Sequence, residues 1–251
     1  MTDRPNHAVR LGPFVKCAHP EMIEAIALAG FDFAVVDMEH VALGPRDLYP
    51  LVVAAQLRGL ELIVRIPARE EAYFKWCLDL GINHIQVPFV ESAEDVATCI
   101  RHSYFSPLGM RGVCRFVRAA DYSATPRERY LAEANRTTQL ILQVEGQRGI
   151  DNLDEILAAA PKGAILFIGP YDLSQSLGKP GDIWAPEVVR AIEDIVVKCR
   201  AKEVGVGIFT DTPDGIGFWA QRGVGLIEYA TDLHIFLSGA AALRAGIRLP
   251  A

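Results

Sequence analysis

The sequence predicts a single (β/α)8 TIM barrel, an α/β fold in which eight parallel strands close into a cylinder surrounded by helices. Eight short apolar runs alternate with helix-like segments along the 251 residues, and each return to a parallel strand needs such a crossover. Eight units in this length favour a closed barrel over an open sheet. After the first strand, positions 16–20 read Lys-Cys-Ala-His-Pro, which lacks the glycine-rich fingerprint of open nucleotide-binding sheets.

The expected strands are short apolar runs that end at charged residues, glycine or proline, which is the pattern of buried strands. In chain order they span residues 11–17, 33–37, 61–65, 84–87, 139–144, 164–168, 204–209 and 226–229. We find no internal repeat and no low-complexity linker. Residues 1–251 are therefore expected to form one barrel domain.

Helical patterns fill the intervals between these strands. The expected helices span residues 20–29, 45–58, 70–80, 93–102, 127–135, 152–160, 186–202, 213–222 and 232–244. Pro20 near the start of the first helix and Gly30 at its end follow the usual asymmetry of helix ends. Two stretches, 103–123 and 169–186, are expected to be loops, and loops of this length are usually functional or contain short elements.

Composition excludes several functional classes. Hydrophobic residues make up 51% of the chain, which is too high for a disordered protein. The net charge is -6 and no Lys/Arg tract stands out, which argues against binding nucleic acid or an anionic membrane. The five cysteines are widely spaced without a CxxC motif, as in proteins with reduced thiols. Residues 1–6 lack a signal-peptide segment, and no run approaches the ~20 apolar residues of a membrane span. We expect a soluble cytoplasmic protein.

Polar and charged side chains follow or end four of the expected strands. In chain order they are Asp37, Glu39, His40, Arg65, Glu145 and Asp172. Because the carboxyl ends of all strands in a barrel share one rim, these side chains are expected to meet there despite their distance in the sequence. Active sites of such barrels are built at that rim.

Glu145 and Asp172 suit a hard divalent cation. Two carboxylates leave coordination positions for water and substrate oxygens, which is the usual arrangement for Mg²⁺. Mn²⁺ accepts the same oxygen ligands. Such an ion would polarise a carbonyl and stabilise an enolate as a Lewis acid. The alternative interpretation is that Arg65 and Glu145 form a purely structural ion pair.

His40 is the expected acid–base group. It lies three residues after Asp37, and a carboxylate beside an imidazole fixes its tautomer and raises its basicity. Arg65 offers a planar fork for a carboxylate or enolate oxygen. Glu39 is expected to support a metal-bound water or a backbone turn rather than to bind the metal directly. His84 begins a strand, at the end of the barrel that serves stability, so a structural role is expected for it.

These residues and their order resemble the HpcH/HpaI aldolase family, the metal-dependent class II pyruvate aldolases, over roughly residues 11–245. The matching segments are residues 29–33, 37–40, 64–67, 86–88, 107–112, 143–145 and 167–174. Family members cleave 2,4-dihydroxyhept-2-ene-1,7-dioate or 2-keto-3-deoxy sugar acids. The resemblance implies reversible cleavage of a 4-hydroxy-2-oxo acid to pyruvate and an aldehyde through a metal-bound pyruvate enolate.

The resemblance also implies roles for single residues. Glu145 and Asp172 look like the two protein ligands of the metal, with Mg²⁺ or Mn²⁺ first and Co²⁺ or Zn²⁺ as alternatives. The remaining implied roles are His40 with Asp37 as the acid–base pair, Arg65 and Gln143 beside the pyruvate, and Gly169, Pro170 and Tyr171 in the turn that receives its carboxylate. Family members form hexamers, trimers of dimers that exchange a C-terminal helix, and residues 232–244 correspond to that helix.

Three segments depart from the family pattern: 114–118, which includes Arg118, 209–213, and the eighth strand with Glu228. We expect them to face the aldehyde half of the substrate. A citrate-lyase-type acyl-CoA lyase, with Arg111, Arg115 and Arg118 binding the CoA phosphates, is the enzymatic alternative, and a non-catalytic metabolite-binding barrel is the other. Only Lys16, among the lysines, falls on an expected strand, which disfavours a Schiff-base mechanism.

Overall fold

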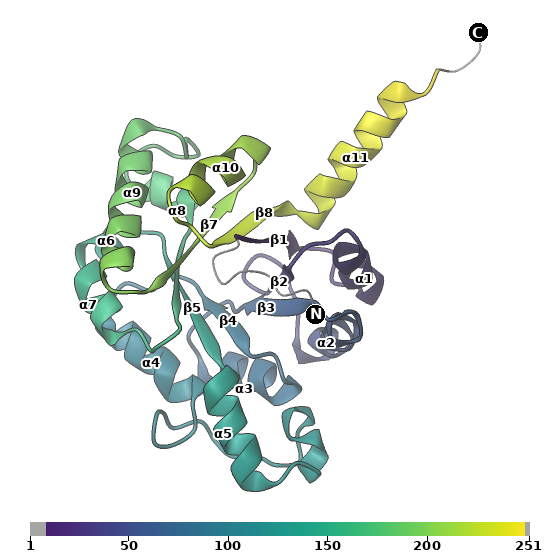
Figure 1. Ribbon diagram of the computed structural model, residues 1–251, viewed down its shortest axis with the longest axis vertical. Helices are drawn as coiled ribbons and strands as arrows, with labels where there is room; N and C mark the ends of the chain where they lie inside the picture. Colours follow the sequence, from purple (N-terminus) through teal and green to yellow (C-terminus); the bar gives the residue numbers. More distant parts are fainter. Residues whose placement is uncertain (1–8, 249–251) are drawn as a thin grey trace.

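The computed structural model describes residues 9–248, and within them the predicted closed barrel of eight parallel strands is confirmed (Figure 1). Each strand pairs with the next along the chain, and β8 returns to β1. The strands are β1 (Arg10–Val15), β2 (Phe33–Asp37), β3 (Glu61–Arg65), β4 (His84–Val87), β5 (Gln139–Val144), β6 (Ile165–Ile168), β7 (Gly205–Thr210) and β8 (Leu226–Thr231). Strands β2 to β5 have the predicted bounds, and the others differ by one or two residues.

Helices surround the barrel and mostly match the expected ranges. They are α1 (Pro20–Leu28), α2 (Pro45–Arg58), α3 (Glu71–Leu80), α4 (Ala93–Ser103), the 3-10 helix η1 (Arg118–Ser123), α5 (Arg127–Thr137), α6 (Gln147–Asp151), α7 (Leu153–Ala159), α8 (Pro170–Ser176), α9 (Pro186–Ala201), α10 (Pro213–Gln221) and α11 (Asp232–Gly246). The predicted loop over 169–186 is wrong in its first half, because Pro170 starts α8; the rigid φ of proline suits the first position of a helix.

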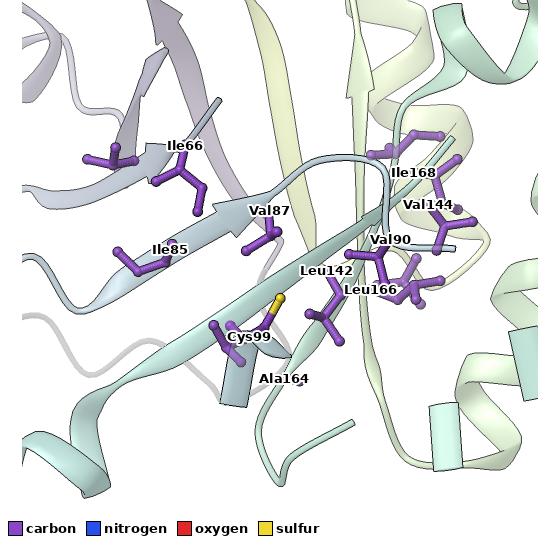
Figure 2. Close-up of a cluster of buried hydrophobic side chains, with 14 of the residues drawn as sticks. Ile66, Ile85, Val87, Val90, Cys99, Leu142, Val144, Ala164, Leu166 and Ile168 are labelled. Carbon is purple, nitrogen blue, oxygen red and sulfur yellow. The ribbon is translucent and has the colours of Figure 1, made fainter. Parts of the chain in front are cut away.

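Side chains alternate between two cores along each strand. On β5, Leu140, Leu142 and Val144 pack outward against the helices, whereas Ile141 faces the interior of the barrel. Figure 2 shows part of the outer core, where side chains of β4, β5 and β6 meet Cys99 of α4. The same alternation directs Gln143 inward, so the interior contains polar groups beneath its open end.

Helix α11 extends away from the barrel instead of packing on it (Figure 1). Its first residue anchors it: the Asp232 carboxylate accepts hydrogen bonds from the main-chain N–H groups of Lys16 and Cys17, at 3.0 and 2.8 Å. Several apolar side chains of the helix are exposed, namely Leu233, Phe236, Leu237 and Leu243. Between residues 9 and 248, no helix combines the length and apolarity needed to cross a membrane. Residues 1–6, where the sequence predicts no signal peptide, lie outside the described residues.

Candidate active site

A cavity of about 240 Å³ opens at the carboxyl ends of the strands. Eight of the predicted site residues line it: His40, Arg65, Gln143, Glu145, Gly169, Pro170, Tyr171 and Asp172. Asp37 and Glu39 lie behind this lining and contact Arg65. The barrel thus brings together groups that are up to 132 positions apart in the sequence, from His40 to Asp172.

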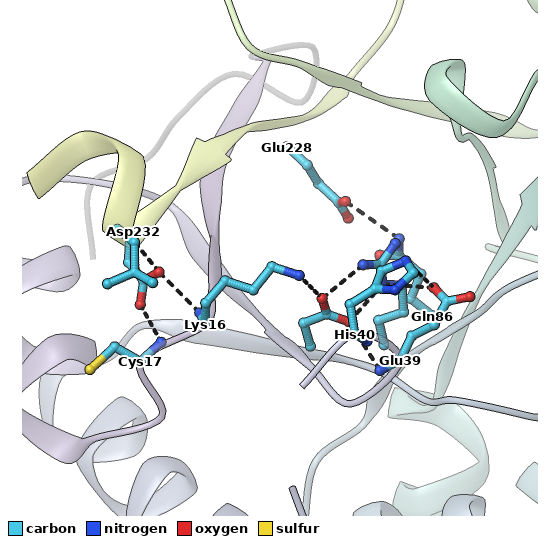
Figure 3. A network of polar contacts seen from close by, with 10 residues as sticks. Lys16, Cys17, Glu39, His40, Gln86, Glu228 and Asp232 are labelled. Carbon is cyan, nitrogen blue, oxygen red and sulfur yellow. Dashed lines mark hydrogen bonds and ion pairs between the residues drawn. The ribbon is translucent and has the colours of Figure 1, made fainter. Parts of the chain in front are cut away.

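Arg65 is held in place by a fully buried carboxylate. Its Nε and Nη2 atoms donate to the two oxygens of Asp37, at 3.0 and 2.9 Å, and Lys16 donates to the same carboxylate (Figure 3). Burial alone would raise the pKa of Asp37, but the hydrogen bonds and charge of Arg65, followed by those of Lys16, lower it to about 2. The pair is in register across β2 and β3. The guanidinium plane is therefore fixed, and Nη1 is not used in the contact with Asp37.

Asp37 stabilises the turn that carries His40, but its carboxylate does not contact the His40 imidazole ring. Asp37 Oδ1 accepts the main-chain N–H groups of Glu39 at 3.0 Å and of His40 at 3.4 Å. The carboxylate beside the imidazole is that of Glu39, whose Oε2 lies 3.9 Å from His40 Nε2. The expected Asp37–imidazole pair is thus replaced by a Glu39–imidazole contact, because a bidentate arginine occupies Asp37. The His40 side chain is 62% exposed and free to meet a ligand.

Glu145 is a buried carboxyl group surrounded by negative charge. It accepts hydrogen bonds from the main-chain N–H of Phe89 at 2.9 Å and from the side-chain amide of Gln143. Burial raises its pKa to about 7; these hydrogen bonds oppose the shift, and the charges of Glu39 and Asp172 add to it. Such a carboxyl group is stabilised as an anion by any cation that enters the cavity.

Glycine at position 169 leaves room for the Glu145 carboxylate. A Cβ atom there would lie 2.4 Å from Glu145 Oε2 and 3.0 Å from Glu145 Cβ, so a side chain at this position would displace that carboxylate. The Gly169 N–H already donates to the carbonyl of Val144 at 3.4 Å, and Pro170 has no N–H. The first-turn N–H groups of Tyr171 and Asp172 are those that remain for a ligand.

The two carboxylates fit a divalent cation whose remaining coordination positions would be filled by water and substrate. Glu145 and Asp172 line one cavity, and oxygen ligands of this kind suit Mg²⁺ and Mn²⁺. Burial is also the first cause of the raised pKa of Glu39, and its Oε2 makes no hydrogen bond although Arg65 Nε lies 3.2 Å away. Among residues 9–248 no three His, Cys, Asp or Glu side chains form a ready-made site. The protein would therefore supply two ligands and leave the other positions open.

Sequence reasoning missed several residues of the site. Lys16 lines the cavity and contacts Asp37, and the aromatic rings of Phe14 and Phe209 form part of the wall. Lys16 follows β1 directly, so its position at the rim was a usable signal. Glu228 and Gln86 are buried inside the barrel and hydrogen-bond each other (Figure 3). Glu228 was expected to face the aldehyde; it lies instead in the interior, because its strand position points inward.

Arg118 is not brought to the cavity. It donates to the carbonyl of Leu80 at 2.8 Å and to the side chain of Gln56, near the end of α3. The carboxyl end of a helix that follows a barrel strand lies at the opposite end of the barrel from the strand ends. Arg118, at the end of segment 114–118, therefore lies away from the strand ends, and the prediction that this segment faces the aldehyde is not supported by its placement.

Known proteins resemble the chain along nearly all of its length. The family model described as HpcH/HpaI aldolase/citrate lyase matches residues 10–238. A 2-dehydro-3,6-dideoxy-6-sulfogluconate aldolase from Pseudomonas putida is 35% identical over 95% of this chain and 92% of its own. A 5-keto-4-deoxy-D-glucarate aldolase from Klebsiella pneumoniae is 32% identical over 92% of this chain and 90% of its own.

A solved structure shows the same relationship in three dimensions. The HpcH/HpaI aldolase/citrate lyase family protein from Burkholderia cenocepacia superimposes with a TM-score of 0.89, at 34% identity and with 96% of each chain covered. Residues 10–238, which the family model matches, include the cavity residues His40, Arg65, Glu145 and Asp172. This chain belongs to the HpcH/HpaI aldolase/citrate lyase family.

Proposed function

We propose that the protein is a divalent-metal-dependent aldolase that reversibly cleaves a 4-hydroxy-2-oxo acid into pyruvate and an aldehyde. The observation that carries the proposal is the cavity itself, in which the carboxylates of Glu145 and Asp172 share one lining with Arg65 and His40. Aldolase activity agrees with the family and with the names of the relatives.

The protein groups divide the reaction between binding and proton transfer. Nη1 of Arg65, on a guanidinium fixed by Asp37, is placed to donate to an oxygen of the 2-oxo acid. His40 accepts the proton of the C4 hydroxyl, the C3–C4 bond breaks, and its electron pair moves to the pyruvate fragment as an enolate. A proton returned to C3 completes pyruvate. In the synthetic direction the same proton transfers run in reverse.

Glu39 supports this proton transfer. Its carboxylate lies 3.9 Å from the imidazole and 3.2 Å from Arg65 Nε, so it links the two groups that handle the substrate. Glu145 and Asp172 would hold a divalent cation, which would supply Lewis-acid stabilisation of the enolate charge.

The acyl-CoA lyase alternative finds less support. A basic surface for CoA phosphates would need free arginines, yet the Arg111 side chain is 3% exposed and paired with Asp79. Arg115 donates to the carbonyls of Ser123 and Thr125, and Arg118 is bound near α3. These three residues therefore stabilise loop structure away from the cavity.

The test is a screen of 4-hydroxy-2-oxo acids in which pyruvate release is coupled to lactate dehydrogenase, before and after EDTA treatment. Turnover should disappear with EDTA and return with Mg²⁺ or Mn²⁺. Glu145→Gln should abolish turnover. Glu187→Gln, which changes an exposed side chain in the first turn of α9, should not. His40→Ala should abolish turnover and retain pyruvate binding, which separates an enzyme from a binding barrel. Pyruvate release that resists metal removal would contradict the proposal.

We further propose that α11 is exchanged between subunits of a hexamer, as the family resemblance implies. The helix leaves the barrel (Figure 1). Its apolar side chains are exposed, with Phe236 70% and Leu243 75% exposed. Burying such a helix on a neighbouring subunit would remove this apolar surface from water. Sedimentation of the purified protein at several concentrations tests the assembly.

A further inference from the structure

A continuous chain of hydrogen bonds runs through the barrel interior to Glu145. Gln143 donates from Nε2 to Glu145 Oε2, and its Oε1 accepts from Gln86 Nε2 at 2.7 Å. Gln86 Nε2 also donates to Glu228 Oε2 at 3.4 Å. All four side chains are almost fully buried, from β4, β5 and β8 and the residue that follows β5.

The direction of this chain depends on how two amide groups are turned. A glutamine side chain has a donor end and an acceptor end, and exchanging them hardly changes its shape. Gln143 can donate to Glu145 only while its oxygen faces the NH₂ group of Gln86. Gln86 presents that NH₂ group in its present orientation. If its amide group were turned by 180°, the amide oxygen would face Gln143 instead.

Glu228 is the group that selects the orientation of Gln86. Its Oε2 accepts from the NH₂ group, and an amide oxygen turned toward it would find another acceptor. Within residues 9–248, Gln86 Oε1 and Glu228 Oε1 have no hydrogen-bond partner, so no other described side chain fixes Gln86 from that side. The nearest charged groups are Arg65 of β3 and Asp37 of β2.

We propose that Glu228 is a positioning residue of the site: through Gln86 it orients the Gln143 amide, which then donates to Glu145. The role of Glu145 as a cation ligand rests on the proposed function, whereas the orientation of Gln143 does not. The residue acts from inside the barrel and does not touch the cavity. Its effect reaches the substrate only through the carboxylate that it helps to place.

Burial makes this arrangement compatible with an uncharged Glu228. It is fully buried, and burial raises its pKa to about 8 against the opposing charge of Arg65. In the protonated form it still accepts a hydrogen bond and carries no charge that would need a partner. The carboxylate form selects this orientation more strongly, because the hydroxyl of the protonated form can also donate to an amide oxygen turned toward it.

The experiment compares the variants Glu228→Leu, Glu228→Gln and Gln86→Leu with a control, Ile165→Val. Ile165 belongs to the same interior cluster, and its register partners are Ile141 and Gly205 and not the hydrogen-bonded residues. The first readout is the side-chain ¹⁵N–¹H amide signal of Gln143 in metal-free protein, identified by its loss in Gln143→Leu. The second is Mn²⁺ affinity, measured by the relaxation of water protons. The third is kcat and KM for pyruvate release.

Glu228→Leu should shift the Gln143 amide signal and weaken Mn²⁺ binding by about 10- to 100-fold. Glu228→Gln keeps an acceptor and should restore most of the affinity. Gln86→Leu should reproduce the loss, and the double variant Glu228→Leu/Gln86→Leu should be no worse than either single one. Ile165→Val should leave the signal and the affinity unchanged.

An unchanged Gln143 signal in Glu228→Leu would overturn the proposal, and so would losses of affinity that add in the double variant. If the wild-type protein binds no Mn²⁺ and releases no pyruvate, the proposed function fails instead. The amide signal still decides the orientation of Gln143 in that case, because it is measured without metal. The two failures are therefore distinguishable.

Discussion

Asp37 shows how a buried charge is stabilised by two cations at once. It is fully buried, yet its pKa is lowered to about 2 because Arg65 and Lys16 outweigh the cost of burial. It also accepts the main-chain N–H groups of the Glu39–His40 turn. One carboxylate therefore sets the position of the arginine and of the segment that carries the histidine.

Asp37→Asn should lower kcat/KM for pyruvate release by about 10- to 100-fold, a loss typical of residues that orient a catalytic group. The amide keeps the shape of the carboxylate but removes the charge that fixes the Arg65 fork. Asp154→Asn, on the exposed surface of α7, serves as the control. Steady-state kinetics of both variants check this, and equal activity of the two would refute the role of Asp37.

Glu228 should make the folded protein less stable as pH rises. Its pKa is about 8 in the folded state and 4.5 when unperturbed, so between these values the folded chain holds a proton that the unfolded chain has lost. The free energy of unfolding then falls by roughly 1 kcal/mol per pH unit, and the whole penalty is present above pH 8.

Glu228→Gln removes this titration and should flatten the decline, although Glu145, with a pKa of about 7, contributes in the same direction in both proteins. Urea unfolding at pH 5 and pH 8.5 measures the difference. The variant should gain stability relative to the wild type at the higher pH. A gain of the same size at both values would show that Glu228 does not titrate in this range.

Residue types at strand ends were predictable, whereas their exact partners were not. Apolar runs that end in charges identified Arg65, Glu145 and Asp172 as groups of one cavity. The spacing of Asp37 and His40 suggested a contact between their side chains, but the structure shows that Arg65 takes this carboxylate. Competition among three neighbouring charges depends on side-chain directions, which spacing does not encode.

The short helix α8 was not predicted from its sequence. Seven residues between Gly169 and Leu177, with a proline at the start and polar side chains throughout, have too weak a periodicity to distinguish a helix from a loop. Longer elements with buried apolar faces, such as α2 and α9, were predicted to within one residue. Element length and amphipathic pattern therefore decide what the sequence alone can reveal.

The β6–α8 connection should not tolerate a side chain at position 169. Gly169→Ala places a methyl group 2.4 Å from Glu145 Oε2, so the carboxylate must move. A displacement of this kind should reduce turnover by about 10²-fold while the barrel remains folded. Gly217→Ala in α10 is the control, because a methyl group there meets no atom within 4 Å. Comparable kinetics of the two variants would contradict this account.

Helix α11 should determine assembly rather than the stability of the barrel. Phe236→Asp places a charge on a side chain that is 70% exposed in the single subunit, so its fold should be little affected. If α11 is exchanged between subunits, the charge is buried and the oligomer should dissociate. Leu28→Asp in α1, 72% exposed, is the control. Sedimentation velocity checks both, and an unaltered oligomer in Phe236→Asp would exclude exchange through this helix.

At the scale of the molecule, a cation that binds only the folded barrel should stabilise it. At a concentration 100 times its Kd, Mn²⁺ should add about 2.7 kcal/mol to the free energy of unfolding and raise Tm. Glu145→Gln should lose this increase, and Glu187→Gln should keep it. Differential scanning calorimetry with and without EDTA provides the measurement. A wild-type Tm that does not respond to Mn²⁺ would remove the support for a metal site.

The fold as a whole was predictable because strand number and helix alternation constrain a parallel sheet strongly. The contacts inside the barrel were less predictable. Gln86 and Glu228 occupy inward positions where apolar residues are usual, and only the closed barrel shows that they face each other. The placement of Arg118 near the carboxyl end of α3 likewise depends on tertiary packing, which no local pattern indicates.

The closure of the ring has a consequence for how the protein acquires activity. Phe14 and Thr231 are paired across the β1–β8 seam, and both belong to the cavity lining. Because the first and last strands must find each other across more than two hundred residues, we expect the seam to form late when the chain refolds. Recovery of turnover after denaturant removal should then lag behind recovery of the helical circular dichroism signal. The appearance of turnover would therefore report when β1 and β8 pair and close the barrel.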